Sequence, residues 1–238
     1  MTQEEFEAKY VNTIVCGDCL DVMRDWPDKC VDLVLTDPPY GVGFNGKATK
    51  FHGPTGERYS EFIDTEENVI NQIIPRFVFA LSKAKRATVT PGTRCSFLYP
   101  NPTEIGGVFC PSGAGIGRWG FTCLHPILYY GNDPQRGCYP NSFSSNALSE
   151  KNDHPCPKPL DWMLWFVKRC SLDNEIILDP FCGSGTTCVA AKKLGRRWIG
   201  IDISENYCQI ARDRLEAVDT GVPVKEARKG QGALFAQP

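Results

Sequence analysis

The sequence predicts an α/β fold in which a mostly parallel β-sheet carries helices on both faces, the doubly wound arrangement. Short apolar runs rich in β-branched residues alternate along the chain with amphipathic helical patterns, which is typical of such sheets. Two of these runs end abruptly in segments rich in proline or glycine. The 238 residues, of which 42% are hydrophobic and 23% charged, favour one compact domain over two. We therefore expect residues 1–238 to form a single domain.

Six runs have the length and composition of strands in this sheet. They cover residues 13–16, 32–36, 87–90, 126–130, 175–179 and 198–202. Three helices are also predicted, over residues 66–82, 186–194 and 204–218. The second ends at Gly195, and the third has Ser204 as its N-cap. The apolar positions of the third helix, which we expect to be buried, are Tyr207, Ala211 and Leu215.

The first predicted helix carries its apolar residues on one stripe, formed by Ile70, Ile73, Ile74, Phe77 and Leu81. Pro75 lies inside it and predicts a kink or a restart. Two stretches, 41–60 and 91–159, are rich in Gly, Pro, Asn and Ser and are weakly patterned, as expected of functional loops. The tail 219–238 has no apolar period and is predicted to be a loose end.

Composition excludes several classes of protein. No apolar run approaches the ~18 residues that cross a bilayer, and the acidic start of the chain is unlike a secretion signal. We therefore expect a cytoplasmic protein whose 12 cysteines stay reduced. Cys16 and Cys19 form a single CxxC, but no second pair at matching spacing completes a zinc site.

The net charge of −2 means that a polyanion would have to bind a local basic patch. One segment has five cations and no acidic residue before Glu104. Its cations are Arg76, Lys83, Lys85, Arg86 and Arg94. Such a segment fits a polyanion-binding face and an ordinary solvated surface equally well.

The first motif is the apolar strand at residues 31–36 that runs into Asp37-Pro38-Pro39-Tyr40. Neither proline can donate a ladder hydrogen bond and each fixes its own φ, so the chain leaves the sheet in a rigid turn. The Pro38 carbonyl is then left without an obligatory partner, between a carboxylate and an aromatic ring. Taken alone, the tetrapeptide could also simply end a strand.

The second motif is a buried strand, a Gly-x-Gly turn and a helix start, at residues 176–187. Its glycines let the backbone pass close to a ligand above the carboxyl ends of the strands. Cys188 stands where a dinucleotide fingerprint has its third glycine, and no Gly-Lys-Ser/Thr follows. Asp202 ends the next strand, 19 residues beyond Gly183, at the distance where an acidic side chain meets a ribose diol. A nucleoside without a phosphate bridge fits this arrangement best.

Together the two motifs resemble the amino-group DNA methyltransferases of the DPPY type, which use S-adenosylmethionine. The base-binding block precedes the cofactor block, which is the order of the beta class. The resemblance spans roughly residues 13–218. It implies a Rossmann-like, circularly permuted methyltransferase fold as one catalytic domain, with double-stranded DNA as the partner and no metal. Permutation moves the termini of a compact α/β fold without moving the site.

The resemblance also implies the site residues. The catalytic block would be Asp37, Pro38, Pro39 and Tyr40. Asp18 and Cys19 would meet the adenine of the cofactor, and the block 154–159, with Lys158 and Pro159, would touch its methionine end. The other cofactor-binding residues would be Asp179, Phe181, Cys182, Gly183, Ser184, Gly185, Thr186, Thr187 and Asp202. Tyr129 or Tyr130 would flank the base pocket, although core packing explains these two tyrosines equally well.

These residue types suit methylation of an amine. The exocyclic nitrogen of adenine or cytosine is a poor nucleophile because its lone pair is delocalised into the ring. If Asp37 and the Pro38 carbonyl accept its two N–H protons, the lone pair is localised and points at the methyl donor. The base must be flipped out of the duplex, and Tyr40 is placed to stack on it.

Several alternatives remain at this point. Asp at the first position of the tetrapeptide favours N6 of adenine, whereas N4-cytosine enzymes more often resemble Ser-Pro-Pro-Tyr and some RNA or protein methylases carry Asn. A carbon-5 cytosine enzyme is disfavoured, because Cys156 precedes Gly183. A nucleoside-binding module without chemistry would not need the DPPY block. Residues 101–153 are the candidate for target recognition, and this short segment favours a homodimer. The sequence indicates neither the recognition site nor a restriction partner.

Overall fold

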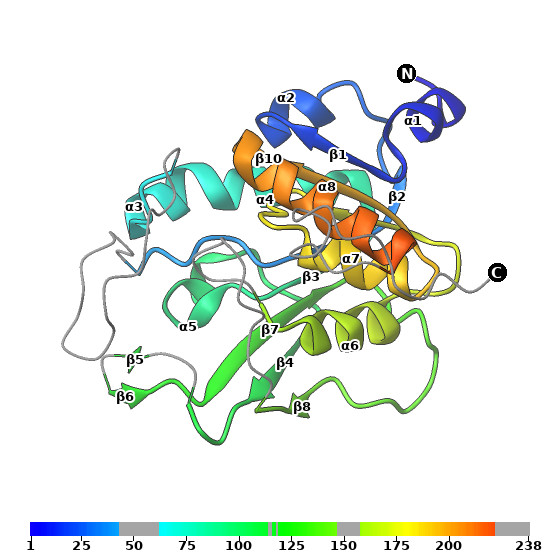
Figure 1. The fold of residues 1–238 in the computed structure, drawn as a ribbon. Helices are drawn as coiled ribbons and strands as arrows, with labels where there is room; N and C mark the ends of the chain where they lie inside the picture. Colours follow the sequence, from blue (N-terminus) through cyan, green and yellow to red (C-terminus); the bar gives the residue numbers. More distant parts are fainter. Residues whose placement is uncertain (43–61, 114–115, 118, 147–157, 222–238) are drawn as a thin grey trace.

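The computed structural model describes residues 1–42, 62–113, 116–117, 119–146 and 158–221, and the structural statements below concern these residues. The main sheet has eight strands (Figure 1). In spatial order they are β1 (Thr13–Cys16), β10 (Arg197–Asp202), β9 (Ile176–Asp179), β2 (Val31–Thr36), β3 (Ala84–Val89), β7 (Leu124–Tyr130), β4 (Glu104–Phe109) and β8 (Phe143–Ser144). A separate hairpin pairs β5 (Ile116–Gly117) with β6 (Gly120–Phe121).

Most neighbouring strands of the main sheet are parallel. The five strands from β1 to β3 in the spatial order all point the same way. The direction then reverses, because β7 is antiparallel to β3 and β4 is antiparallel to β7. The predicted α/β fold with a mostly parallel sheet is confirmed.

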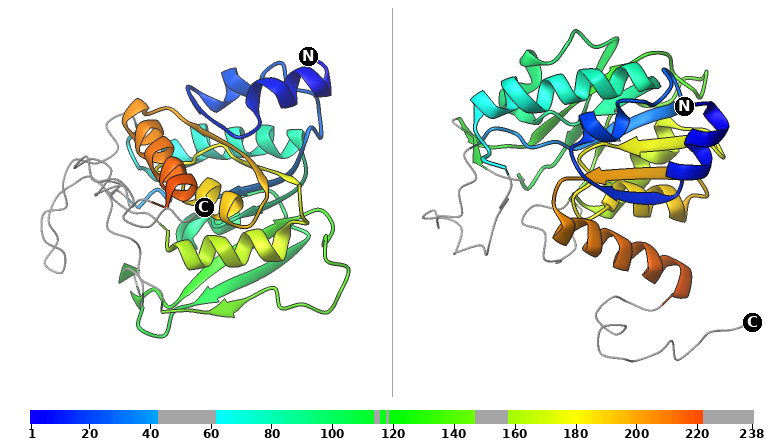
Figure 2. Two further views of the ribbon diagram at one scale, coloured as in Figure 1. Left: turned by 45° about the vertical axis from the view of Figure 1, so that its right-hand side comes forward. Right: turned by 90° about the horizontal axis from the view of Figure 1, so that it is seen from above.

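Helices cover both faces of the sheet (Figure 2). One core cluster joins the sheet to α1 (Gln3–Tyr10), α2 (Cys19–Met23) and α4 (Ile74–Lys83). The other joins it to α6 (Leu160–Cys170), α7 (Thr186–Lys193) and α8 (Glu205–Thr220). Alternate residues of β2 serve the two clusters, because Val34 belongs to the first and Leu33 and Leu35 to the second. Among the described residues, no helix combines the length and apolarity that a membrane crossing needs.

Each of the six predicted strands is present, as β1, β2, β3, β7, β9 and β10. The predicted helices 186–194 and 204–218 are α7 and α8, and the three apolar residues expected to be buried on α8 are buried. Ser204 takes the N-cap position of α8, but its side chain makes no capping hydrogen bond. Helix α8 continues to Thr220, past the predicted end at residue 218, and residues 222–238 of the predicted tail lie outside the described part of the chain.

The predicted helix at residues 66–82 is broken into three pieces. These are α3 (Glu66–Asn68), a π-helical turn (Val69–Ile73) and α4. The N–H of Ile74 bonds back to the Val69 carbonyl, so one extra residue enters the turn just before Pro75, which confirms the predicted restart. The extra residue also rotates the buried stripe. Ile70, which belongs to the predicted apolar stripe, is therefore 43% exposed, whereas Val69, Ile73 and Phe77 are buried.

The weakly patterned stretch 91–159 contains more structure than the sequence predicts. After β3 come the short helix α5 (Gly92–Cys95) and a 3₁₀ turn (Ser96–Leu98). Strands β4 and β7, both within the candidate target-recognition segment 101–153, belong to the main sheet. The parts of that segment outside the main sheet are therefore its connections, which include residues 110–123 and 131–142.

The topology also locates a crevice. Helix α7 follows β9 and packs on one face, whereas α4 follows β2 and packs on the other. Because β9 and β2 are neighbours, their crossovers diverge at this point, which is a topological switch point of the sheet. Ligands of open α/β sheets bind outside the carboxyl ends of the strands at such a point. That edge lies on the left of Figure 1, near α3 and α5.

Candidate active site

The two sequence motifs meet at the carboxyl ends of β2 and β9. Thr36, the last residue of β2, donates a hydrogen bond of 2.7 Å from Oγ1 to Oδ1 of Asp179, the last residue of β9. Both side chains are buried. Burial raises the pKa of Asp179 to about 6. The hydrogen bonds from Thr36 and the Phe181 N–H act in the opposite direction, because they favour the charged form. Two segments 143 residues apart in the sequence are thus joined directly.

The Asp37 side chain is held by residues from three parts of the chain. Its Oδ1 accepts a hydrogen bond from the Tyr40 hydroxyl and another, of 2.5 Å, from Thr90 Oγ1. Its Oδ2 lies 3.1 Å from the Lys158 ammonium. The same ammonium lies 4.6 Å from the centroid of the Tyr40 ring. The resemblance placed Lys158 at the methionine end of the cofactor, and the structure places its ammonium against the DPPY block.

Tyr40 is fixed by close packing. Burial, and secondarily the neighbouring Asp37, raise the pKa of Tyr40 above its ordinary value, so the hydroxyl stays protonated and donates to Asp37. Gly92 has a φ of +70°, and a Cβ on it would stand 2.7 Å from the Tyr40 ring. Glycine is required here because the first residue of α5 lies directly against that ring.

The chain after Tyr40 is anchored by a buried carboxylate. Asp64 accepts hydrogen bonds from the Gly41 N–H at 2.6 Å and from the Val42 N–H at 3.2 Å. No backbone N–H of the described residues donates to the Pro38 carbonyl, as the two prolines predict. The DPPY turn therefore keeps an accepting oxygen beside the Asp37 carboxylate.

On the other side of the crevice, Asp202 holds the glycine turn. Its Oδ2 accepts from the Gly183 N–H at 2.8 Å, and its Oδ1 accepts from the Ser204 N–H at 2.9 Å. Both carboxylate oxygens thus lie at the carboxyl end of β10, beside the glycine turn. Asp202 therefore suits a ligand that presents a pair of hydroxyl donors.

Asp18 is paired with a cation that the sequence analysis did not assign to the site. Arg76 of α4 donates from Nε to Oδ1 at 3.2 Å and from Nη2 to Oδ2 at 2.5 Å. Burial acts to raise the pKa of Asp18, but Arg76 and the Leu20 N–H hold it below its ordinary value. Asp18 is therefore a charged acceptor at the N-terminus of α2.

One cavity collects nearly all of the predicted site residues. It is lined by the whole DPPY block, by Lys158 and by the two segments assigned to the cofactor adenine and ribose. Of the predicted residues, Pro159 and Gly185 are missing from its wall. Pro159 instead accepts the Trp162 N–H at the start of α6, and Gly185 begins α7 beneath Ala211 of α8. The remaining residues of the block 154–159, His154–Pro157, lie outside the described residues.

The cavity has further walls that the motifs did not reveal. The additional lining residues are Gly17, Val42, Phe62, Asp64, Gln72, Ile73, Arg76, Met163, Pro180, Ile203, Ser204 and Tyr207. Several of these residues follow a motif strand within a few residues, so their position in the sequence indicates that they lie near the site. Asp64, Gln72 and Arg76 carry no such signal. They lie before α3, in the π-helical turn and on α4, and these segments reach the cavity only through the packing of the whole fold.

The two tyrosines proposed to flank the base pocket do not line the cavity. The Tyr129 hydroxyl donates to the Asn141 carbonyl, and the Tyr130 hydroxyl donates to the Pro100 carbonyl. Because β7 is antiparallel to β3, its beginning, not its end, lies at the site edge of the sheet. The pocket-flanking prediction is therefore wrong, and the core-packing interpretation is right. His125, near the start of β7, has its pKa lowered to about 4 by burial and by Lys158.

Comparisons with known proteins agree with this geometry. Residues 83–213, more than half of the chain, match the family model N6_N4_Mtase, described as DNA methylase. The chain is 29% identical over 216 residues to the Escherichia coli (strain K12) protein named "Putative methylase YubD", a match that covers 87% of this chain and 92% of that relative. It is 25% identical over 254 residues to the type II methyltransferase M.HinfI of Haemophilus influenzae, covering 88% of this chain and 69% of the relative.

Solved structures match the fold over most of the chain. PvuII DNA methyltransferase, described as cytosine-N4-specific, aligns with a TM-score of 0.63 at 15% identity, covering 91% of this chain and 89% of that one. The complex of M1.HpyAVI with S-adenosylmethionine aligns with a TM-score of 0.57 at 22% identity, covering 85% and 98%. The fold is thus the Rossmann-like fold of the DNA methyltransferases. The chain belongs to the DNA methylase family that modifies amino groups, at N6 or N4.

Proposed function

We propose that this protein transfers a methyl group from S-adenosylmethionine to the exocyclic N6 amine of an adenine flipped out of double-stranded DNA. The observation that carries the proposal is the shared cavity at the switch point, which is lined both by Asp37 and Pro38 and by residues 181–184 of the glycine turn. Direct transfer of a methyl group requires that the acceptors for the amine lie close to the nucleoside pocket, and here the two lie on adjoining strands. The block order supports the beta class.

The residues on the cofactor side fit S-adenosylmethionine. Asp202 is a carboxylate at the end of β10, beside the glycine turn, where it would accept from a ribose diol, and Asp18 offers a charged acceptor for an adenine amine. The cavity wall also contains the apolar residues Phe181 and Ile203, against which an adenine ring would pack. The cofactor supplies an electrophilic methyl group on a sulfonium. The protein supplies position and electrostatics.

On the base side, Asp37 and Pro38 act as acceptors. Because Tyr40 and Thr90 already occupy Oδ1 of Asp37, a target amine would use Oδ2, the oxygen now facing Lys158. With one N–H on Oδ2 and the other on the Pro38 carbonyl, the lone pair of the nitrogen turns toward the cofactor side. The amine loses one proton in the reaction, and the Asp37 carboxylate is placed to take it.

N4 of cytosine is the second candidate target. The structure of PvuII DNA methyltransferase, described as cytosine-N4-specific, supports it at the level of the fold. Asp37 at the first position of the tetrapeptide favours adenine. Both targets present an exocyclic amine, so the acceptors of the DPPY block serve either one.

The proposal is tested by incubating the protein with radiolabelled S-adenosylmethionine and unmethylated DNA, RNA or protein in parallel. The DNA is then hydrolysed and its nucleosides are separated. We expect label in DNA alone, in N6-methyl-2′-deoxyadenosine. Label in N4-methylcytosine alone would refute the adenine assignment, and label in RNA or protein without DNA would refute the proposed substrate class.

A further inference from the structure

The hairpin β5–β6 carries an aromatic side chain that packs on nothing in the described structure. Gly117 of β5 pairs with Gly120 of β6, and Trp119 directly precedes Gly120 in the sequence. Its exposed fraction is 103%, the highest of the large hydrophobic side chains described. Phe121, in the second strand of the hairpin, is 75% exposed. A fully solvated tryptophan gains nothing for stability, because none of its apolar surface is removed from water.

The strand directions place this hairpin beside the candidate active site. Strands β2 and β3 run parallel and end at the edge where Asp37 and Thr90 lie. Strand β7 is antiparallel to β3 and begins at that edge, and β4 is antiparallel to β7 and ends there. The connection 110–123, which contains the hairpin, therefore extends from the same edge, as Figure 1 shows for β5 and β6. Neighbouring strands lie ~4.8 Å apart, so β7 begins about 10 Å from β2 and β4 ends about 15 Å from β2. Both distances are within the width of a DNA duplex.

The surroundings of the hairpin suit a polyanion. Residues 105–132 contain no Asp or Glu, although the chain as a whole has 28 acidic residues in 238. Arg118 precedes Trp119 in the sequence. Phe109 and Leu124, which oppose each other where β4 meets β7 at the base of this connection, are about half exposed. The connection thus presents apolar and aromatic surface without the negative charge that would repel phosphates.

A base that leaves a duplex must be unstacked, and the gap it leaves must be filled. Apolar side chains inserted between base steps perform this task in proteins that deform DNA, and aromatic rings stack on any base. We propose that Trp119 inserts into the base stack of the DNA next to the flipped base and stabilises the open duplex. This inference rests on the proposed function, because it requires a DNA duplex at the DPPY edge.

The test compares Trp119→Ala and Trp119→Phe with wild type. Phe97→Ala serves as the control, because Phe97 is also exposed (76%) but belongs to the 3₁₀ turn after α5. The probe is PCR-amplified plasmid DNA, which contains no methylated adenine or cytosine. We expect Trp119→Ala to lower kcat/KM on this duplex at least 10-fold. Trp119→Phe should keep most of the wild-type kcat/KM, and Phe97→Ala should change kcat/KM less than twofold. Binding of S-adenosylmethionine should stay within twofold in all three variants.

A second readout follows the tryptophan itself. The difference in fluorescence between wild type and Trp119→Phe reports Trp119, and we expect the duplex to quench it by half or more, because stacking on bases quenches indole emission. Turnover of Trp119→Ala within twofold of wild type, or emission of Trp119 that the duplex leaves unchanged, would overturn the inference. A wild-type protein that transfers no methyl group to any DNA would instead refute the proposed function. If the wild-type protein is a dimer and Trp119→Ala is a monomer, Trp119 contacts a second copy of the chain, and the inference is overturned.

Discussion

At the scale of single residues, the candidate site depends on how carboxylates are shared. Asp37 has one oxygen occupied by hydroxyl donors and one facing a cation, whereas each oxygen of Asp202 accepts one backbone N–H. The two carboxylates therefore differ in what they can offer a ligand. Asp37 presents the oxygen that Lys158 faces to the base side, whereas Asp202 holds the glycine turn on the cofactor side.

This difference predicts a separation of roles. Asp37→Ala should lower turnover by about 100- to 1000-fold and leave binding of S-adenosylmethionine within a few-fold, because it removes an acceptor aimed at the target amine. Asp202→Ala should weaken cofactor binding by about 10- to 100-fold, because it removes hydrogen bonds to a charged group. Titration calorimetry and single-turnover methylation measure the two effects.

Asp21→Ala is the matched control, since Asp21 is an exposed carboxylate on α2 that pairs with Arg24. It should change neither quantity. Wild-type turnover in both Asp37→Ala and Asp202→Ala would contradict the assignment of roles.

The sequence predicted most of these residues but not their partners. The DPPY block and the glycine turn are continuous in sequence, so a motif reveals them. Arg76 and Thr90 reach Asp18 and Asp37 from elements with no motif of their own. Such contacts depend on the register of strands and helices in the finished fold, which a single sequence does not encode locally.

At the scale of elements, strands with continuous apolar runs were predicted well. These strands, β1, β2, β9 and β10, contribute residues to the core clusters under the helices, and burial requires the apolar residues that make the runs recognisable. Strand β4 was missed because it contains Gly106 and Gly107, which weaken a strand pattern. A Cβ at Gly106 would stand 2.1 Å from the Asn141 carbonyl oxygen, so the glycine is needed for that close approach. Helix α6 was missed although its buried residues follow the helical period, at Trp162, Met163, Phe166, Val167 and Cys170.

Helix α7 begins at a glycine whose conformation and packing can be separated by mutation. Gly185 has a φ of +77°, and a Cβ there would lie 2.7 Å from the Ala211 Cβ of α8. Gly195, just after the same helix, has a φ of +69°, and an added Cβ would meet nothing within 4 Å.

We therefore expect Gly195→Ala to lower the free energy of unfolding by about 1–2 kcal/mol, from backbone strain alone. Gly185→Ala should cost a further ~1–3 kcal/mol, because α8 must move away from α7. Urea denaturation of the apo protein measures both. Equal losses in the two variants would show that the contact with Ala211 contributes nothing.

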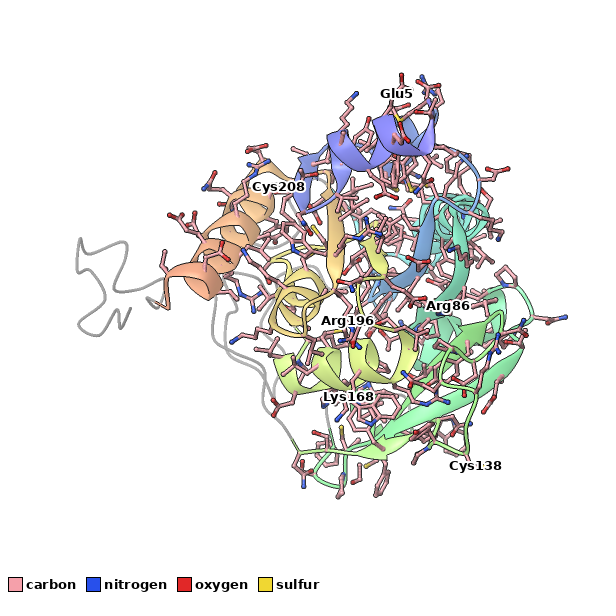
Figure 3. All side chains as sticks on the ribbon, turned by 90° about the vertical axis from the view of Figure 1, so that its right-hand side faces the viewer. Glu5, Arg86, Cys138, Lys168, Arg196 and Cys208 are labelled. Carbon is pink, nitrogen blue, oxygen red and sulfur yellow. The ribbon has the colours of Figure 1, made fainter. Side chains whose placement is uncertain are left out.

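At the scale of the whole molecule, the basic segment is not one surface. Arg76 points into the cavity and Arg94 donates to the Gly41 carbonyl. Lys83, Lys85 and Arg86 stand around the start of β3, at the edge opposite the site, where they pair with Asp28, Asp32 and Glu175. Figure 3 views that edge and labels Arg86. The polyanion-binding interpretation of the whole segment is therefore wrong.

A substitution at Lys85 tests whether the cations at this edge of the sheet contact DNA. The Lys85 side chain is 60% exposed and pairs with Asp32 on the far edge of the sheet. We expect Lys85→Ala to leave the KM for duplex DNA within twofold and to leave its salt dependence between 50 and 200 mM unchanged. A lost phosphate contact would instead lower the slope of log KM against log salt by about one.

The sheet order has a consequence for how the chain is made. Strand β1 is an edge strand, and its neighbour β10 is the last strand of the sheet to be synthesised. Roughly 180 residues separate them, so at ~5–20 residues per second the first strand waits on the order of 10–40 s for its partner. The β2–β9 crevice is likewise incomplete until the glycine turn has emerged. A ribosome that stalls before this point leaves a chain with open strand edges, which makes the nascent form, rather than the finished enzyme, the one most in need of a chaperone.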